Sequence, residues 1–160
     1  MANITNVPLL DLTRFNKIQE QEYIESFKAF LHSGRYIMGP ELKEFEEECA
    51  QYCGAQYALG VSSGTDALLL ALMALNIGRG DEVICPTYTF FATAGCIWRT
   101  GARPVFVDSN LSDYNINAEK IEDAITKKTK AIIPVHLFGQ CANMNAIMDI
   151  AQRHKLYVIE

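Results

Sequence analysis

From residue 57 onward, short apolar runs alternate with segments of helical periodicity, and this alternation constrains the fold more than any other feature of the chain. The runs are rich in Val and Ile, as is typical of strands that are buried on both faces. They predict a three-layer α/β domain, with a mainly parallel sheet between helices. We expect strands at residues 57–61, 82–85, 104–107, 131–135 and 156–159, and helices at residues 65–77, 89–100, 117–126 and 143–155.

The first 56 residues have a different pattern. Apolar residues recur at helical spacing from Ile18 to Leu31 and again from Leu42 to Tyr52, which predicts two amphipathic helices. We therefore expect an N-terminal helical segment, residues 1–56, followed by the first part of a large α/β domain, residues 57–160. The chain stops on an apolar run that is typical of a core strand, and this predicts that the domain is truncated.

The segment at 65–77 is apolar almost all round, which predicts a central, buried helix. The residues just before it should then lie in the middle of the domain.

Charge and composition exclude several classes of function. The formal net charge is -5 and the sequence pI is about 5.2, so there is no basic stripe for a nucleic acid. No apolar stretch reaches the roughly 18 residues of a membrane helix, and no leader pattern opens the chain, which predicts a soluble, cytoplasmic protein. The five cysteines lack paired CxxC spacing, so we expect reduced thiols and no metal site.

In an open parallel sheet, ligands bind at the carboxyl ends of the strands. Small and hydroxyl-bearing residues, Ser63, Gly64 and Thr65, join the first expected strand to the start of the buried helix. Free N–H groups, the helix dipole and the hydroxyls would together bind a phosphate. An ordinary helix N-cap explains the same residues, because Ser and Thr are favoured caps.

Two further side chains follow expected strands. Phe90 could offer its ring face to a planar aromatic ligand, or it could pack in the core with Phe91. His136 is the only histidine at the carboxyl end of an expected strand, and a structural role is as consistent with the pattern as a catalytic one.

A serine hydrolase is the rival enzyme class. Residues 60–64 match the GxSxG nucleophile elbow, and Asp108 and His136 follow Ser62 in the hydrolase order. An elbow normally follows several earlier strands, however, and only helices are expected before residue 57. A non-enzymatic alternative is that the chain is an oligomerisation piece without activity of its own.

Six segments, taken in order, resemble the DegT/DnrJ/EryC1/StrS family of sugar aminotransferases, which depend on pyridoxal 5'-phosphate (PLP). They are Gly34–Glu41, Ser62–Leu68, Gly80–Ile84, Pro86–Thr93, Gly101–Asp108 and Pro134–Gly139. The resemblance implies the large domain of the fold type I, aspartate aminotransferase-like PLP enzymes, in a homodimer with shared active sites. It implies that Gly64 and Thr65 contact the cofactor phosphate and that Phe90 stacks on the pyridine ring. Because neighbouring helix positions point about 100° apart, only one of the two adjacent rings can face the site, and the resemblance leaves Phe91 with the apolar body of the domain. From their places at the strand ends, we expect Ser63 and His136 in the cofactor site as well.

The same resemblance implies a reaction. PLP would take an amino group from a donor, commonly glutamate, and pass it to a keto group on a nucleotide-linked sugar, although some relatives are dehydratases. In the family, the Asp that pairs with the pyridine nitrogen and the Schiff-base lysine would both lie beyond residue 160. No lysine here follows a strand, so the chain alone should not catalyse transamination, and no residue in it is predicted to be catalytic.

Overall fold

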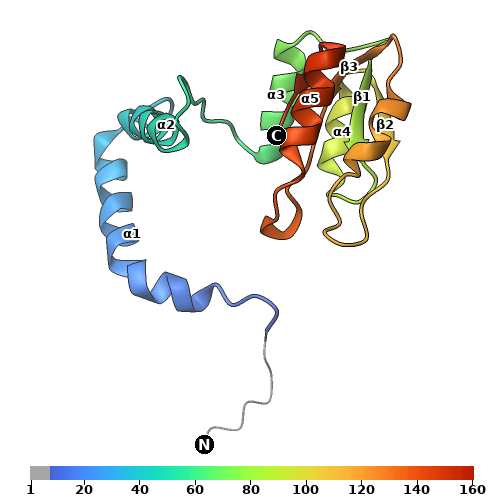
Figure 1. Ribbon diagram of the computed structural model, residues 1–160. Helices are drawn as coiled ribbons and strands as arrows, with labels where there is room; N and C mark the ends of the chain where they lie inside the picture. The colour runs from blue at the N-terminus through green and yellow to red at the C-terminus, as the bar shows by residue number, and fades with distance from the viewer. Residues whose placement is uncertain (1–7) are drawn as a thin grey trace, which may run out of the picture. The chain divides into compact units, whose positions relative to one another are not determined.

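The computed structural model describes residues 8–160, apart from the side chains of residues 14–16. The chain divides into two compact units, one that ends at Gly60 and one that spans Val61–Glu160. The first unit contains helices α1, Thr13–Ser33, and α2, Pro40–Cys53 (Figure 1). Both helices were expected, and Pro40 occupies the first turn of α2, where its missing N–H costs nothing.

The second unit is a parallel α/β domain. Its sheet has the strand order β2-β1-β3-β4, and every described pair of neighbouring strands is parallel. The strands are β1, Glu82–Pro86; β2, Arg103–Val107; β3, Thr129–Ile132; and β4, Tyr157–Val158. The helices are α3, Gly64–Ala74; α4, Ala92–Arg99; and α5, Met144–His154.

Side chains of β1 alternate between two apolar cores, one on each face of the sheet. Val83 and Cys85 pack with Leu72 of α3 and Ile97 of α4. Ile84 packs on the other face with residues of α5. The predicted three-layer arrangement is therefore confirmed, with α3 and α4 on one face and α5 on the other.

The expectation of a strand at residues 57–61 is wrong. This segment pairs with no strand among the described residues. The Gly60 N–H instead donates to Glu46 Oε1 of α2 at 2.7 Å, so a side chain replaces the ladder hydrogen bond. The apolar run is no part of the sheet, and its residues up to Gly60 belong to the helical unit.

The expected helix at 117–126 is also wrong in type, because two short 3-10 helices stand there, η1 Ala118–Lys120 and η2 Glu122–Ala124. The helical turns end before Thr126, because its N–H donates to Thr129 Oγ1 and its hydroxyl donates to Glu82 Oε2.

Helix α3 is not enclosed on all sides. Leu72 is fully buried, but Leu70 and Met73 are 44% and 56% exposed. One side of α3 packs on α4 and the sheet, and nothing in its own unit covers the other side.

Candidate functional site

A pocket of about 470 Å³ opens at the carboxyl edge of the sheet. It lies entirely within the α/β unit and is bounded by the start of α3, the segment before α4, the chain beyond β3 and the chain beyond β4. Its lining residues are Gly64, Thr65, Leu68, Thr89, Phe90, Ala92, Thr93, Ile133, Pro134, Val135, His136 and Glu160. Four of the five predicted site residues, Gly64, Thr65, Phe90 and His136, meet in this pocket.

The first turn of α3 presents free hydrogen-bond donors to this pocket. No described residue accepts from the N–H groups of Gly64 and Thr65 or bonds to the Thr65 hydroxyl. A side chain at Gly64 would meet no atom within 4 Å, so the space beside its backbone is open. With the positive end of the helix dipole, these donors form a site suited to an anion.

Ser63, the fifth predicted residue, does not line the pocket but stands at the N-cap of α3. Its Oγ accepts from the Asp66 N–H at 3.1 Å and donates to Asp66 Oδ2 at 2.9 Å. The Ser62 hydroxyl also donates to Asp66 Oδ2. The hydrogen bonds from these two hydroxyls lower the pKa of Asp66 below its ordinary value, and the bond from Ser62 has the larger effect.

Cys96 of α4 contacts the first turn of α3, and it was not predicted as a site residue. Its Sγ donates to the Thr65 carbonyl oxygen at 3.2 Å, and its side chain is fully buried in α4. Burial raises the pKa of the thiol, so it stays a neutral donor. A contact across 31 residues leaves no local signal in the sequence.

Phe90 and Phe91 both precede the first residue of α4, Ala92. Phe90 lines the pocket with a 77% exposed side chain, which leaves its ring free to meet a ligand. Phe91 was expected to pack in the apolar body of the domain, and this is wrong, because it is 80% exposed. Its ring lies over Gly95 on the surface of α4.

His136 and Glu160 form the far wall of the pocket. His136 Nε2 lies 2.8 Å from Glu160 Oε2, and His136 Nδ1 accepts from the Ala142 N–H at 3.1 Å. Both ring nitrogens therefore have protein partners.

The hydrolase geometry is absent. The Ser62 hydroxyl is bonded to Asp66, and the ring nitrogens of His136 are bonded to Glu160 and Ala142. Asp108 forms an ion pair with Lys120 and does not line the pocket. No nucleophile–base pair is assembled at Ser62.

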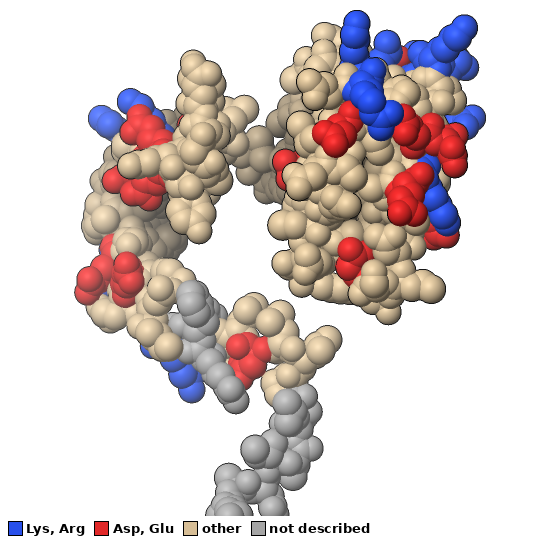
Figure 2. Space-filling model, viewed as in Figure 1, with Lys and Arg blue, Asp and Glu red and all other residues tan. Residues whose placement is uncertain are grey.

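The lysines of the α/β unit lie away from the pocket. Figure 2 shows the Lys and Arg side chains of this unit gathered mainly at the top of the view. The chain beyond β3 lines the pocket, and the loops after β2 and β3 lie at the bottom of the same view in Figure 1. Lys127 and Lys128 precede β3, and Lys155 precedes β4. Among the described residues, no lysine lines the pocket.

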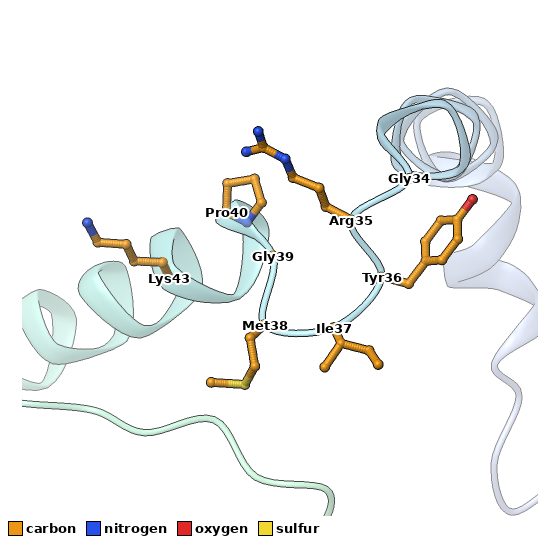
Figure 3. Close-up of a pocket in the computed structure, with 8 residues that line it drawn as sticks. All are labelled: Gly34, Arg35, Tyr36, Ile37, Met38, Gly39, Pro40 and Lys43. Carbon is orange, nitrogen blue, oxygen red and sulfur yellow. The ribbon is translucent and has the colours of Figure 1, made fainter.

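A second pocket, of about 520 Å³, belongs to the helical unit and is lined by the loop between α1 and α2 and by the start of α2 (Figure 3). Tyr36 anchors the loop, because its hydroxyl donates to the Leu31 carbonyl oxygen at 2.9 Å. Ile37 and Met38 are exposed, and Met38 has a left-handed backbone conformation. The loop exposes apolar side chains beside Arg35 and Lys43, but it holds no pair of groups poised for acid–base or nucleophilic chemistry.

Residues 17–160 match the DegT/DnrJ/EryC1/StrS aminotransferase family. The chain belongs to this family. In the described residues, no helix is long and apolar enough to cross a membrane, and no cluster of side chains fits a metal ion.

Three similar proteins illustrate the relationship. The chain is 46% identical to the dTDP-3-amino-3,6-dideoxy-alpha-D-galactopyranose transaminase of Aneurinibacillus thermoaerophilus, over 96% of this chain and 42% of that protein. The structure of DesV from S. venezuelae, in complex with a ketimine intermediate, has a TM-score of 0.93 at 44% identity, over 95% of this chain and 41% of DesV. The structure of NtdA from Bacillus subtilis, with bound cofactor PMP, has a TM-score of 0.95 at 39% identity, over 99% of this chain and 37% of NtdA. The chain thus spans about two fifths of the length of these relatives.

Proposed function

We propose that the complete protein is a PLP-dependent aminotransferase, which transfers an amino group from glutamate to a keto group of a nucleotide-linked sugar. This chain would contribute much of the cofactor pocket. Family membership, a relative that is named a sugar-nucleotide transaminase, and structural similarity to NtdA with bound PMP all support the proposal.

One observation carries it: the start of α3 and the ring of Phe90 line the same pocket. A PLP molecule has a dianionic phosphate at one end and a flat, electron-poor ring at the other. The free N–H groups of Gly64 and Thr65 and the Thr65 hydroxyl suit the phosphate. Phe90 offers an uncovered apolar ring face to the pyridine. A volume of about 470 Å³ is also in the range of cofactor sites.

PLP, when bound, supplies an electron sink that makes amino-group transfer possible. The chain's own residues bind and orient it. Gly64 permits close approach because no side chain fills the space beside its backbone. Ser63 acts through the cap of α3, and Cys96 holds the Thr65 carbonyl, so both keep the anion-binding turn in shape. His136 belongs to the wall of the site.

The lysine that holds the cofactor lies outside this chain in this proposal, since no described lysine lines the pocket. The complete protein is a cytoplasmic homodimer in which the two subunits share the active sites. The exposed apolar side chains of the chain support association into a dimer, because a partner surface would cover them. They include Ile37, Met38, Leu70 and Met73.

The experiment is a half-reaction. The complete protein is loaded with PLP and given glutamate without any acceptor sugar. We expect about one equivalent of 2-oxoglutarate per site, because the amino group then stays on the cofactor. Further turnover should require a nucleotide-linked keto sugar. Release of no 2-oxoglutarate by a PLP-loaded protein would reject glutamate as the donor, and failure to take up PLP would reject the proposal as a whole.

A further inference from the structure

The histidine at the pocket wall is bonded on both sides of its ring. A backbone N–H can only donate, so the bond from Ala142 requires that His136 Nδ1 carry no proton. The proton of the neutral ring then sits on Nε2, which donates to Glu160 Oε2 at 2.8 Å. Both contacts select the same tautomer.

These bonds join three parts of the pocket wall. His136 follows the carboxyl end of β3, Glu160 follows β4, and Ala142 ends the loop before α5. Among the described residues, strand β4 pairs with β3 alone, at two positions, Ala131 with Tyr157 and Ile132 with Val158. The main-chain bond from Ile159 to Ile132 adds one more tie. Beyond this bond, the His136–Glu160 contact holds the chain after β4 against the chain after β3.

The loop after His136 has a second anchor. Asn115 is buried, its Nδ2 donates to the Gln140 carbonyl oxygen, and its Oδ1 accepts from the Leu137 N–H, both at 3.0 Å. Between these anchors, Phe138 has a left-handed backbone conformation, which a non-glycine residue keeps only where its surroundings enforce it. The loop is therefore held in one arrangement from two sides.

We infer that His136 is a positioning residue. In its Nε2–H tautomer it fastens the Glu160 carboxylate and the Ala142 backbone to the end of β3, and it gives no ring nitrogen to a bound ligand. The pocket wall is assembled before a ligand arrives. The consequence for PLP rests on the proposed function, whereas the tautomer is a property of the chain itself.

The tautomer is measured by long-range ¹H–¹⁵N correlation NMR on the 160-residue chain with ¹⁵N-labelled histidine. The chain has three histidines, so His32→Gln and His154→Gln assign the signals by loss. We expect His136 as a single Nε2–H form. Glu160→Ala removes the acceptor of the Nε2 proton and leaves the bond from Ala142, so it should keep the Nε2–H form but shift the Nε2 signal. Glu160→Gln, which keeps an acceptor oxygen, should leave that signal near its wild-type position. A dominant Nδ1–H form, or a wild-type signal that Glu160→Ala leaves unchanged, would overturn the inference.

The second measurement uses the complete protein with PLP. His136→Gln keeps a donor for Glu160, and His136→Asn keeps an acceptor for Ala142, so each removes one bond. We expect each to weaken PLP binding on the order of tenfold. His154→Gln is the matched control, because His154 Nε2 makes the same kind of bond to Glu122, 2.9 Å away, outside the pocket. PLP should leave the His136 ring signals in the Nε2–H pattern. A change of tautomer on addition of PLP, or unchanged affinity in both variants, contradicts the positioning role.

Discussion

Phe90 and Phe91 are adjacent in the sequence and equally exposed, yet they face different surroundings. Phe90 lines the pocket, and the Phe91 ring lies over Gly95. The sequence alone suggested that one ring meets the ligand and the other is buried, because neighbouring helix positions point about 100° apart. That reasoning does not apply to Phe90, since α4 begins only at Ala92. Exposure of a ring depends on where a helix begins, and helix starts are the least certain part of a sequence-based assignment.

This geometry leads to a prediction for the two rings in the complete protein. Phe90→Ala should weaken PLP binding by about 1 kcal/mol, roughly fivefold, through loss of the stacking ring. Phe91→Ala should change the free energy of unfolding by only about 0.5 kcal/mol, as for other surface positions. PLP dissociation constants and denaturant midpoints measure both effects. A Phe91→Ala variant that loses the cofactor at normal stability would show that the assignment is off by one residue.

At the scale of single elements, α3 is the helix on which the site depends. Ser63 begins it with a side-chain cap, and the preference of Ser for this position made the helix start predictable. The helix ends at Ala74, whereas the apolar pattern continues to residue 77, because the chain turns at Asn76 with a left-handed backbone. Segments 57–61 and 117–126 could not be predicted, since the partners Glu46 and Glu82 that decide them lie far away in the sequence.

Ser63→Ala should destabilise the α/β unit by about 1 kcal/mol at neutral pH through loss of the cap. The sign of its pH dependence follows from Asp66. Hydrogen bonds lower the folded-state pKa of Asp66 from its ordinary 3.8, so this carboxylate stabilises the fold above pH 3.8 and ceases to do so as the pH falls through the folded pKa.

The difference in stability between wild type and Ser63→Ala should therefore shrink in acid. Urea unfolding at a series of pH values measures it, and Ser62→Ala, which removes a hydroxyl bond to Asp66 without touching the cap, is the matched control. A difference that grows as the pH falls would contradict the assigned role of Asp66.

At the scale of the whole molecule, the parallel sheet was predictable and the site only in part. The four strands of the α/β unit begin and end within three residues of the expected positions, because Val- and Ile-rich runs leave a strong pattern. The rule that ligands bind at carboxyl strand ends then selected Phe90 and His136, whereas Thr65 was selected through the expected strand at 57–61, which does not form. The supporting contacts of Cys96 and Glu160 depend on packing between elements, which the sequence pattern does not show.

The central claim is that the first turn of α3 binds the phosphate of PLP, and the most direct test is the PLP dissociation constant of two Thr65 variants of the complete protein. Thr65→Val keeps the shape of the side chain and removes the hydroxyl, while Thr65→Ser keeps the hydroxyl. A hydrogen bond to a charged group contributes roughly 1.5–3 kcal/mol, so Thr65→Val should bind PLP about 10- to 150-fold more weakly. Thr65→Ser should stay within about threefold of wild type. If both variants bind PLP as tightly as the wild type at unchanged denaturant midpoints, Thr65 is only a helix residue and the phosphate binds elsewhere.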